Sequence, residues 1–259
     1  RLAPMLLGMG LLDGVDDADI LAWQDPDDGD GDGISGRAAI LNPAGDSPQV
    51  GRFGWKAAQA SLREQVAQAF AEDLGIDNPL RRAASCAQQA KGDGQLLLHC
   101  QRASGADRDG VEISESLLDA VVFYVANLAM PAAAAEPHAA GQQLFQQLGC
   151  AACHRPALPA GKRSARAYSD LLLHDMGAAL ADPVAEGDAL GSEWRTAPLW
   201  GLGIRSREPD NTRLLHDGRA RSIAEAIHWH GGEGQRAAER FQQLSADQQA
   251  SLIQFLKEL

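Results

Sequence analysis

Two cysteines and a histidine stand together as Cys150-Ala-Ala-Cys153-His154. This is the C-x-x-C-H pattern through which a c-type haem is attached covalently to a protein. Thiols at this spacing reach the two vinyl groups of one porphyrin, and the adjacent histidine then faces the iron. A redox dithiol or a chance pair of cysteines would not require the histidine. A fold that encloses so large a flat group needs loops around it. Residues 155–220, rich in Gly, Pro, Asp and Arg, are expected to supply them.

The composition favours a packed, helical protein. The chain has 259 residues, 45% hydrophobic and 22% charged, which suits one large domain or two smaller ones. Ala, Leu, Gln and Glu are abundant while aromatic and β-branched residues are few, and this favours helix over sheet. The net charge of −12 opposes nucleic-acid binding. No apolar run is long enough to span a bilayer. Because the chain begins at Arg1 rather than Met, we expect a trimmed or partial product.

Apolar spacing predicts the main helices. They are expected at residues 56–74, 114–129, 223–230 and 246–259, with a short one before Cys150 and one in the first two dozen residues, capped by Asp13 or Asp16. Ser245-Ala-Asp-Gln248 is a capping-box pattern that starts the last helix. The helix at 114–129 is expected to bury a stripe of Leu117, Leu118, Val121, Val122, Val125 and Leu128. Residues 76–110 are predicted to be a loop region. The segment 131–137, PAAAAEP, is the predicted linker, so we place the domain boundary between residues 130 and 131.

Cys86 and Cys100 form a second cysteine pair. In an oxidising compartment a disulfide between them would stabilise the fold by roughly 3 kcal/mol through loop entropy. The alternative is a pair of reactive thiols, but only Arg102 is a basic neighbour of Cys100. Both the predicted disulfide and the C-x-x-C-H motif indicate a location outside the cytoplasm.

The sixth iron ligand has several candidates, because cytochrome irons take Met or His. They are Met176, His174, His216, His228 and His230. On a helix His228 and His230 lie on roughly opposite faces, so at most one of them faces the iron. Arg195 and Arg219 are candidates for contacts with haem propionates, since a guanidinium fork matches a carboxylate. The alternative for both arginines is an ordinary ion pair.

An acidic stretch, Asp28-x-Asp30-x-Asp32-Gly33, has the oxygen spacing of a calcium loop. The twelfth position counted from Asp28 is Ala39 rather than Glu, so the stretch is not an EF-hand. It is either an acidic turn or a calcium site that other oxygens complete.

Five longer motifs are spread along the chain: DGDGISGR, GRFGWKA, DLLLHDMG, TAPLWGLG and LLHDGRARSIAEAIHWHGGEG. Together they resemble the bacterial di-haem oxidoreductase family, also called thiol oxidoreductases. That family is related to the di-haem cytochrome c peroxidases and to the methylamine-utilisation di-haem enzymes. Its members carry two C-x-x-C-H motifs, and this chain carries one. The resemblance implies that residues 1–130 are the distal part of a first cytochrome-c-like domain, whose haem segment lies upstream of Arg1. Residues 131–259 are then a c-type haem domain.

The resemblance bears on the ligands. In the peroxidases a His-Asp-Gly turn precedes the axial ligand of the second haem. His216-Asp217-Gly218 matches this turn, and His230, 14 positions after His216, falls where the peroxidases place an axial Met. His154 and His230 are therefore the favoured pair, giving a low-spin haem of fairly low potential, with Met176 as the alternative sixth ligand. His174 is then expected at the haem edge or a propionate. The related peroxidases also bind calcium between their domains, which favours a calcium site at the acidic stretch.

The resemblance also implies catalytic residues. In the peroxidases a Trp lies between the two haems, and an acid above the first haem helps to cleave peroxide. Trp55 matches the Trp, with Leu62 and Gln65 in the same register, and the acid falls at Glu72 or Asp73. The alternatives are a core aromatic and a solvated helix end.

The expected protein is mainly α, with two cytochrome-c-like lobes and long haem-wrapping loops. The resemblance implies a periplasmic, peroxidase-like di-haem oxidoreductase in which this chain's haem transfers electrons. Its expected partner is an electron-donor protein or a small redox substrate. The alternative is a non-enzymatic electron-transfer cytochrome c, since an iron with two histidine ligands has no open position.

Overall fold

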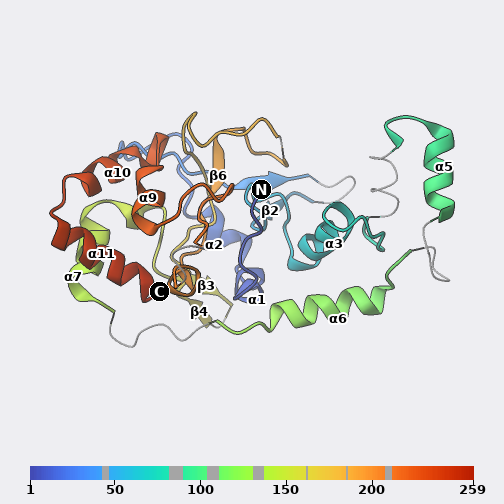
Figure 1. Ribbon diagram of the computed structural model, residues 1–259, viewed down its shortest axis with the longest axis horizontal. Coiled ribbons are helices and arrows are strands. Elements are labelled where there is room, and N and C mark those ends of the chain that lie inside the picture. The colour runs from blue at the N-terminus through green and yellow to red at the C-terminus, as the bar shows by residue number, and fades with distance from the viewer. Residues whose placement is uncertain are drawn as a thin grey trace.

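The computed structural model describes residues 1–42, 47–81, 90–103, 111–130, 137–161, 163–184, 186–207 and 212–259. Within them the chain is mostly helical, with three two-stranded antiparallel sheets (Figure 1). The helices are α1 (Met9–Asp13), α2 (Asp17–Leu21), α3 (Leu62–Glu72), α5 (Gly94–Ala103), α6 (Glu115–Ala126), α7 (Ala139–Gln147), α8 (Leu202–Arg205), α9 (Ile223–His228), α10 (Gln235–Gln242) and α11 (Ala246–Lys257), with short 3-10 turns η1 (Cys150–Ala152) and η3 (Gly232–Gly234). The strands pair as β1 (Ala39–Leu41) with β2 (Gln49–Gly51), β3 (Leu158–Ala160) with β4 (Arg163–Ala165), and β5 (Leu173–Asp175) with β6 (Glu193–Arg195). No described helix is long and apolar enough to cross a membrane.

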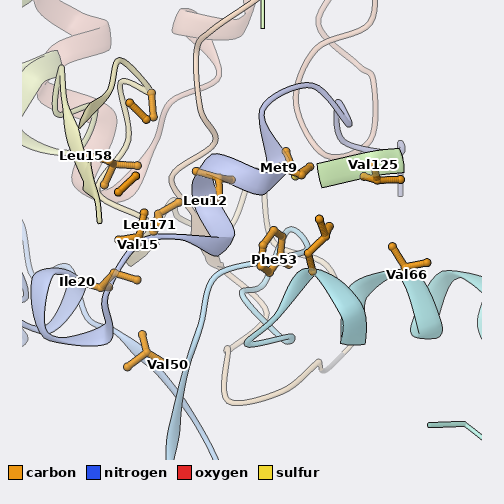
Figure 2. Close-up of a cluster of buried hydrophobic side chains, with 14 of the residues drawn as sticks. Met9, Leu12, Val15, Ile20, Val50, Phe53, Val66, Val125, Leu158 and Leu171 are labelled. Carbon is orange, nitrogen blue, oxygen red and sulfur yellow. The ribbon is translucent and has the colours of Figure 1, made fainter. Parts of the chain in front are cut away.

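A first cluster of buried apolar side chains lies where α1, α3 and α6 meet. Figure 2 shows Leu12, Phe53 and Val66 among its members. Leu158 and Leu171, from the second half of the chain, belong to the same cluster. The core of the first half therefore includes residues from beyond residue 131. The domain boundary between residues 130 and 131 stays a prediction.

A second cluster lies between α7, α9, α10 and α11. Figure 1 shows these helices grouped at one end of the molecule, away from α5 and α6. Phe145, Phe241 and Phe255 are buried in this cluster. Because α7 is followed directly by the turn that carries Cys150, packing of α7 on α11 fixes where the C-x-x-C-H motif lies.

Local capping decides where α3 begins. Ser61 and Glu64 form a capping box, so α3 begins at Leu62, later than the predicted residue 56. Asp13, expected to cap a helix in its own segment, caps α3 instead, because its carboxylate accepts from the Leu62 N–H at 2.7 Å. An acceptor from a distant segment cannot be identified from local spacing.

Other helices show both agreement and error. The predicted capping box of Ser245 and Gln248 is present at the start of α11. By contrast, α5 lies inside the segment predicted to be loop. The predicted stripe of α6 is only partly buried: Leu118 and Val125 are buried, whereas Leu117 is 49% exposed. The buried stripe of α6 is narrower than predicted, because α6 packs against α1 and α3 along one edge.

Candidate functional site

A cavity of about 560 Å³ lies beside the second cluster. Most of its wall is apolar. The predicted haem-binding residues Cys150, Cys153, His154, His174, Met176, Arg195, His216 and His230 all line it, as do Trp55 and Trp194. Arg219 and His228 do not line it. The structure thus brings most of the predicted site into one place. Its residues come from segments as far apart in the sequence as Trp55 and His230.

His154 and His230 face each other across this cavity. Their ring centroids are 6.5 Å apart. The Nδ1 atom of His154 donates to the Tyr168 carbonyl at 2.9 Å, and that of His230 donates to the Ala226 carbonyl at 2.8 Å. A carbonyl can only accept, so each ring carries its proton on Nδ1 and presents a lone pair at Nε2. Among the described residues no hydrogen bond reaches either Nε2.

Burial keeps both rings neutral. It lowers the pKa of His154 to about 4, and it also lowers the pKa of His230. Neutral imidazoles with a free Nε2 and an anchored Nδ1 are in the form that binds a metal. His228 projects from the same segment to the exposed side, against Phe241, as the spacing of two predicts.

The cysteines lie on a tight turn. Gly149 takes the left-handed conformation (φ 92°) and opens η1, which carries Cys150. Cys150 and Cys153 are both free thiols. Burial raises the pKa of Cys150 to about 11 and also raises the pKa of Cys153. Reactive dithiols need a depressed thiol pKa, so the pair does not suit dithiol redox chemistry.

The residues present fit a c-type haem. Two imidazole nitrogens bound to one metal at about 2 Å each place the ring centres roughly 6 Å apart, close to the spacing of His154 and His230. The thiols of Cys150 and Cys153 line the same cavity. Apolar walls suit a porphyrin face.

Arg195 supplies a buried positive charge at the cavity wall. Its Nε donates to the Gly54 carbonyl at 2.8 Å and its Nη1 to the Thr196 carbonyl at 3.1 Å. Burial lowers its pKa to about 10. No carboxylate among the described residues pairs with it, which suits a propionate partner. Arg219 has instead the ordinary alternative, an ion pair with Asp217.

His174 is held between two carboxylates. Its Nε2 lies 3.0 Å from Asp170 and its Nδ1 lies 2.6 Å from Glu233, and Nδ1 is also 3.6 Å from the sulfur of Cys153. Burial lowers the pKa of His174, but Asp170, Cys153 and Glu233 together raise it to about 12. With a carboxylate at each ring nitrogen, His174 has no free lone pair, which suits the predicted place at the haem edge better than that of an iron ligand.

Aromatic rings border the other side of the cavity. His216 stacks on Trp194 with centroids 3.7 Å apart, and Trp55 meets His216 edge-on at 6.4 Å. The Nε1 of Trp55 donates to the Leu2 carbonyl at 2.6 Å. Met176 packs beside His230, since a Cβ added at Gly234 would lie close to both side chains, and its role as the alternative sixth ligand stays a prediction.

The remaining predicted residues lie elsewhere. Glu72 and Asp73 are exposed at the end of α3, and neither lines the cavity. Their catalytic role stays a prediction. Cys100 lies in α5 and is disulfide-bonded. Its predicted partner, Cys86, lies outside the described residues, so that pairing stays a prediction.

Three carboxylates of the acidic stretch lie close together, and they are not the three that the sequence predicts. Oxygens of Asp25, Asp28 and Asp30 lie within 4.8 Å of one another. Asp32 is not in this group, and its carboxylate accepts from the Ile34 N–H at 2.9 Å. The predicted set of Asp28, Asp30 and Asp32 therefore shares two members with this group, and calcium binding stays a prediction.

Sequence reasoning missed the partners of His174. Asp170 stands four residues before His174 in DLLLHDMG, and Glu233 stands in the HGGEG turn after His230. Both motifs are visible in the sequence, yet nothing in their spacing indicates that they meet. Arg205, Arg236 and Arg240 also line the cavity.

Fold and site define a helical protein with a cavity suited to a covalently attached haem. The family described as "Di-haem oxidoreductase, putative peroxidase" matches residues 1–259, and the chain belongs to this family. No curated protein matches the chain. A solved structure of hydrazine synthase from Kuenenia stuttgartiensis, pressurised with xenon, is similar at 22% identity and a TM-score of 0.41, over 63% of this chain. The match spans 62% of that chain's length.

Proposed function

We propose that this chain carries the electron-transfer haem of a periplasmic, peroxidase-like di-haem oxidoreductase. Cys150 and Cys153 would hold the haem through thioethers, and His154 and His230 would bind its iron. When bound, the haem supplies a one-electron centre. The observation that carries the proposal is the pair of neutral imidazoles facing each other across a thiol-lined cavity.

The residues around the cavity have distinct parts in this proposal. Arg195 would neutralise a propionate, and the apolar wall would exclude water, which lowers solvent reorganisation at the iron. Two histidine ligands leave no open coordination position, so substrate would meet a second haem. The family is di-haem and this chain has one C-x-x-C-H motif, so that second haem would be held by protein outside residues 1–259.

Trp55 is the better electron relay of the two indoles at the cavity. The ammonium of Lys56 lies 3.6 Å from the centre of the Trp194 ring. A cation this close opposes removal of an electron from Trp194. No cation from the described part of the chain lies over the Trp55 ring, and its Nε1–H bond to the Leu2 carbonyl favours oxidation. Export to the periplasm is supported by the disulfide-bonded Cys100. An electron-donor protein is the proposed partner.

The ligand assignment is tested by the spin state of the ferric, haem-loaded protein. We expect a low-spin EPR spectrum that becomes high-spin in His230→Ala, because the sixth position opens. His228→Ala is the matched control, since His228 comes from the same segment and is exposed, and its spectrum should not change. A low-spin His230→Ala protein together with an altered Met176→Leu protein would assign the sixth position to Met176.

The enzymatic role needs the complete protein with all its haems. We expect it to oxidise a reduced c-type cytochrome in a peroxide-dependent way, more slowly after Trp55→Phe. We also expect a high-spin ferric signal beside the low-spin one. A purely low-spin spectrum without peroxide-dependent turnover would favour the electron-transfer cytochrome instead.

A further inference from the structure

The segment from Tyr168 to Gly177 reaches both of the facing histidines. At one end, the Tyr168 carbonyl accepts the proton of His154 Nδ1. Tyr168 and Leu171 are buried and hold positive φ angles of 51° and 63°. Such angles are strained for residues with side chains, and they persist only where the surroundings fix them. The segment is therefore shaped by its contacts rather than by local preference.

At its middle the segment contributes Asp170 and His174 to a buried ionic network that Glu233 completes from η3. The side chains are 2%, 4% and 10% exposed, respectively. Glu233 is further held by the N–H of Asp175 at 3.1 Å, and by the N–H and hydroxyl of Ser35 at 3.1 and 3.0 Å. His174 is the shared partner of both carboxylates, so removing Glu233 would take away the one ionic contact that joins His174 to the turn after His230 and leave His174 paired with Asp170 alone.

At its other end the segment packs against the turn that follows His230. Glu233 lies in η3, three residues beyond His230. A Cβ added at Gly232 would lie 2.8 Å from the Gly177 nitrogen and would collide with the Asp175 carbonyl. The backbone of this turn therefore lies directly on residues 175–177, and the His174–Glu233 bond joins the same two segments.

We propose that the Asp170–His174–Glu233 network is a positioning device that holds His230 opposite His154. It acts through the backbone, since none of the three is an iron ligand in the proposed site. By keeping the turn at residues 230–234 on the segment at 168–177, it keeps the sixth coordination position filled. The inference rests on the proposed function, because it concerns the same haem site.

Glu233→Gln in the haem-loaded protein tests the device. Gln keeps the size of the side chain but removes the charge that pairs with His174. We expect covalent haem content to be unchanged and a high-spin component to appear in the ferric spectrum. Carbon monoxide should bind the ferrous protein about tenfold faster, because the open fraction of the sixth position rises by that factor. Glu239→Gln, an exposed change on α10, is the matched control and should alter neither readout.

Two further variants keep the outcomes distinct. Ser35→Ala removes one donor to Glu233 and should shift both readouts in the same direction by a smaller factor. This variant replaces Glu233→Gln in the test if Glu233→Gln does not fold. A lower Tm for Glu233→Gln or Ser35→Ala with an unchanged spectrum and carbon monoxide rate would reduce the network to a structural role and overturn the inference. If His230→Ala itself stays low-spin, the ligand assignment fails instead.

Discussion

Replacing Gly141 by Ala tests the helix packing that positions the C-x-x-C-H motif. Gly141 lies in the first turn of α7, against α11. A Cβ at this position would lie 2.5 Å from the Cβ of Phe255 and closer still to the carbonyl oxygen of Ser251. Neither atom is the end of a flexible side chain. The two helices must therefore move apart to admit one methyl group.

Two effects of opposite sign decide the result. Ala is favoured over Gly within a helix by roughly 0.8–1 kcal/mol. Overpacking a core costs about 1–3 kcal/mol, and the upper end applies because backbone atoms are in the way. The expected net loss of stability is about 2 kcal/mol. For a chain of this size that lowers the Tm by roughly 4–8 °C.

The assay is thermal unfolding of the haem-loaded protein, followed by far-UV circular dichroism. Gly94→Ala is the control, since Gly94 also belongs to a helix and an added Cβ there meets nothing within 4 Å. That variant should be neutral or more stable by up to about 1 kcal/mol. If Gly141→Ala raised the Tm as Gly94→Ala is expected to do, the close packing of α7 on α11 would be refuted.

Three further predictions use other contacts. Leu118→Ala should cost about 3 kcal/mol and Leu117→Ala under about 0.5 kcal/mol in urea unfolding, because only the first is buried. Lys56→Met should lose about 2 kcal/mol or more in the same assay, since the fully buried Lys56 ammonium serves three backbone carbonyls that Met leaves unpaired. Burial raises the pKa of Glu193, but Arg37 and a backbone N–H outweigh it and hold that pKa below the usual 4.5. The stability from this pair is therefore complete above about pH 4.5 and lost as the pH falls through the native pKa, so the difference between wild type and Glu193→Gln should shrink on acidification.

Sequence reasoning succeeded where chemistry is encoded by short spacing. The capping box of α11 and the opposite facing of His228 and His230 each depend on neighbours within a few residues. The family membership expected from five motifs is confirmed. Such features can be predicted from the sequence because local geometry alone determines them.

It failed where the partner comes from a distant segment. Asp13 caps α3 across 49 positions, and Glu233 reaches His174 across 59. The predicted stripe of α6 is wider than the buried one. Periodicity identifies the apolar face of a helix but not how much of that face another element covers. Leu117 is therefore exposed, although the pattern alone makes it equivalent to Leu118.

The histidines of this one cavity show why residue type could not settle their roles. His154, His174 and His230 are all largely buried, and burial acts on each in the same direction, toward the neutral ring. Their difference lies in what faces Nδ1 and Nε2. A single backbone carbonyl fixes the proton of His154 and of His230 and leaves a free lone pair, which suits a ligand. Two carboxylates engage both nitrogens of His174 and keep it charged, which suits a positioning role. Because Tyr168, Ala226, Asp170 and Glu233 cannot be recognised as these partners from residue type, the sequence supplies the candidate histidines and the fold distinguishes a ligand from a positioning residue.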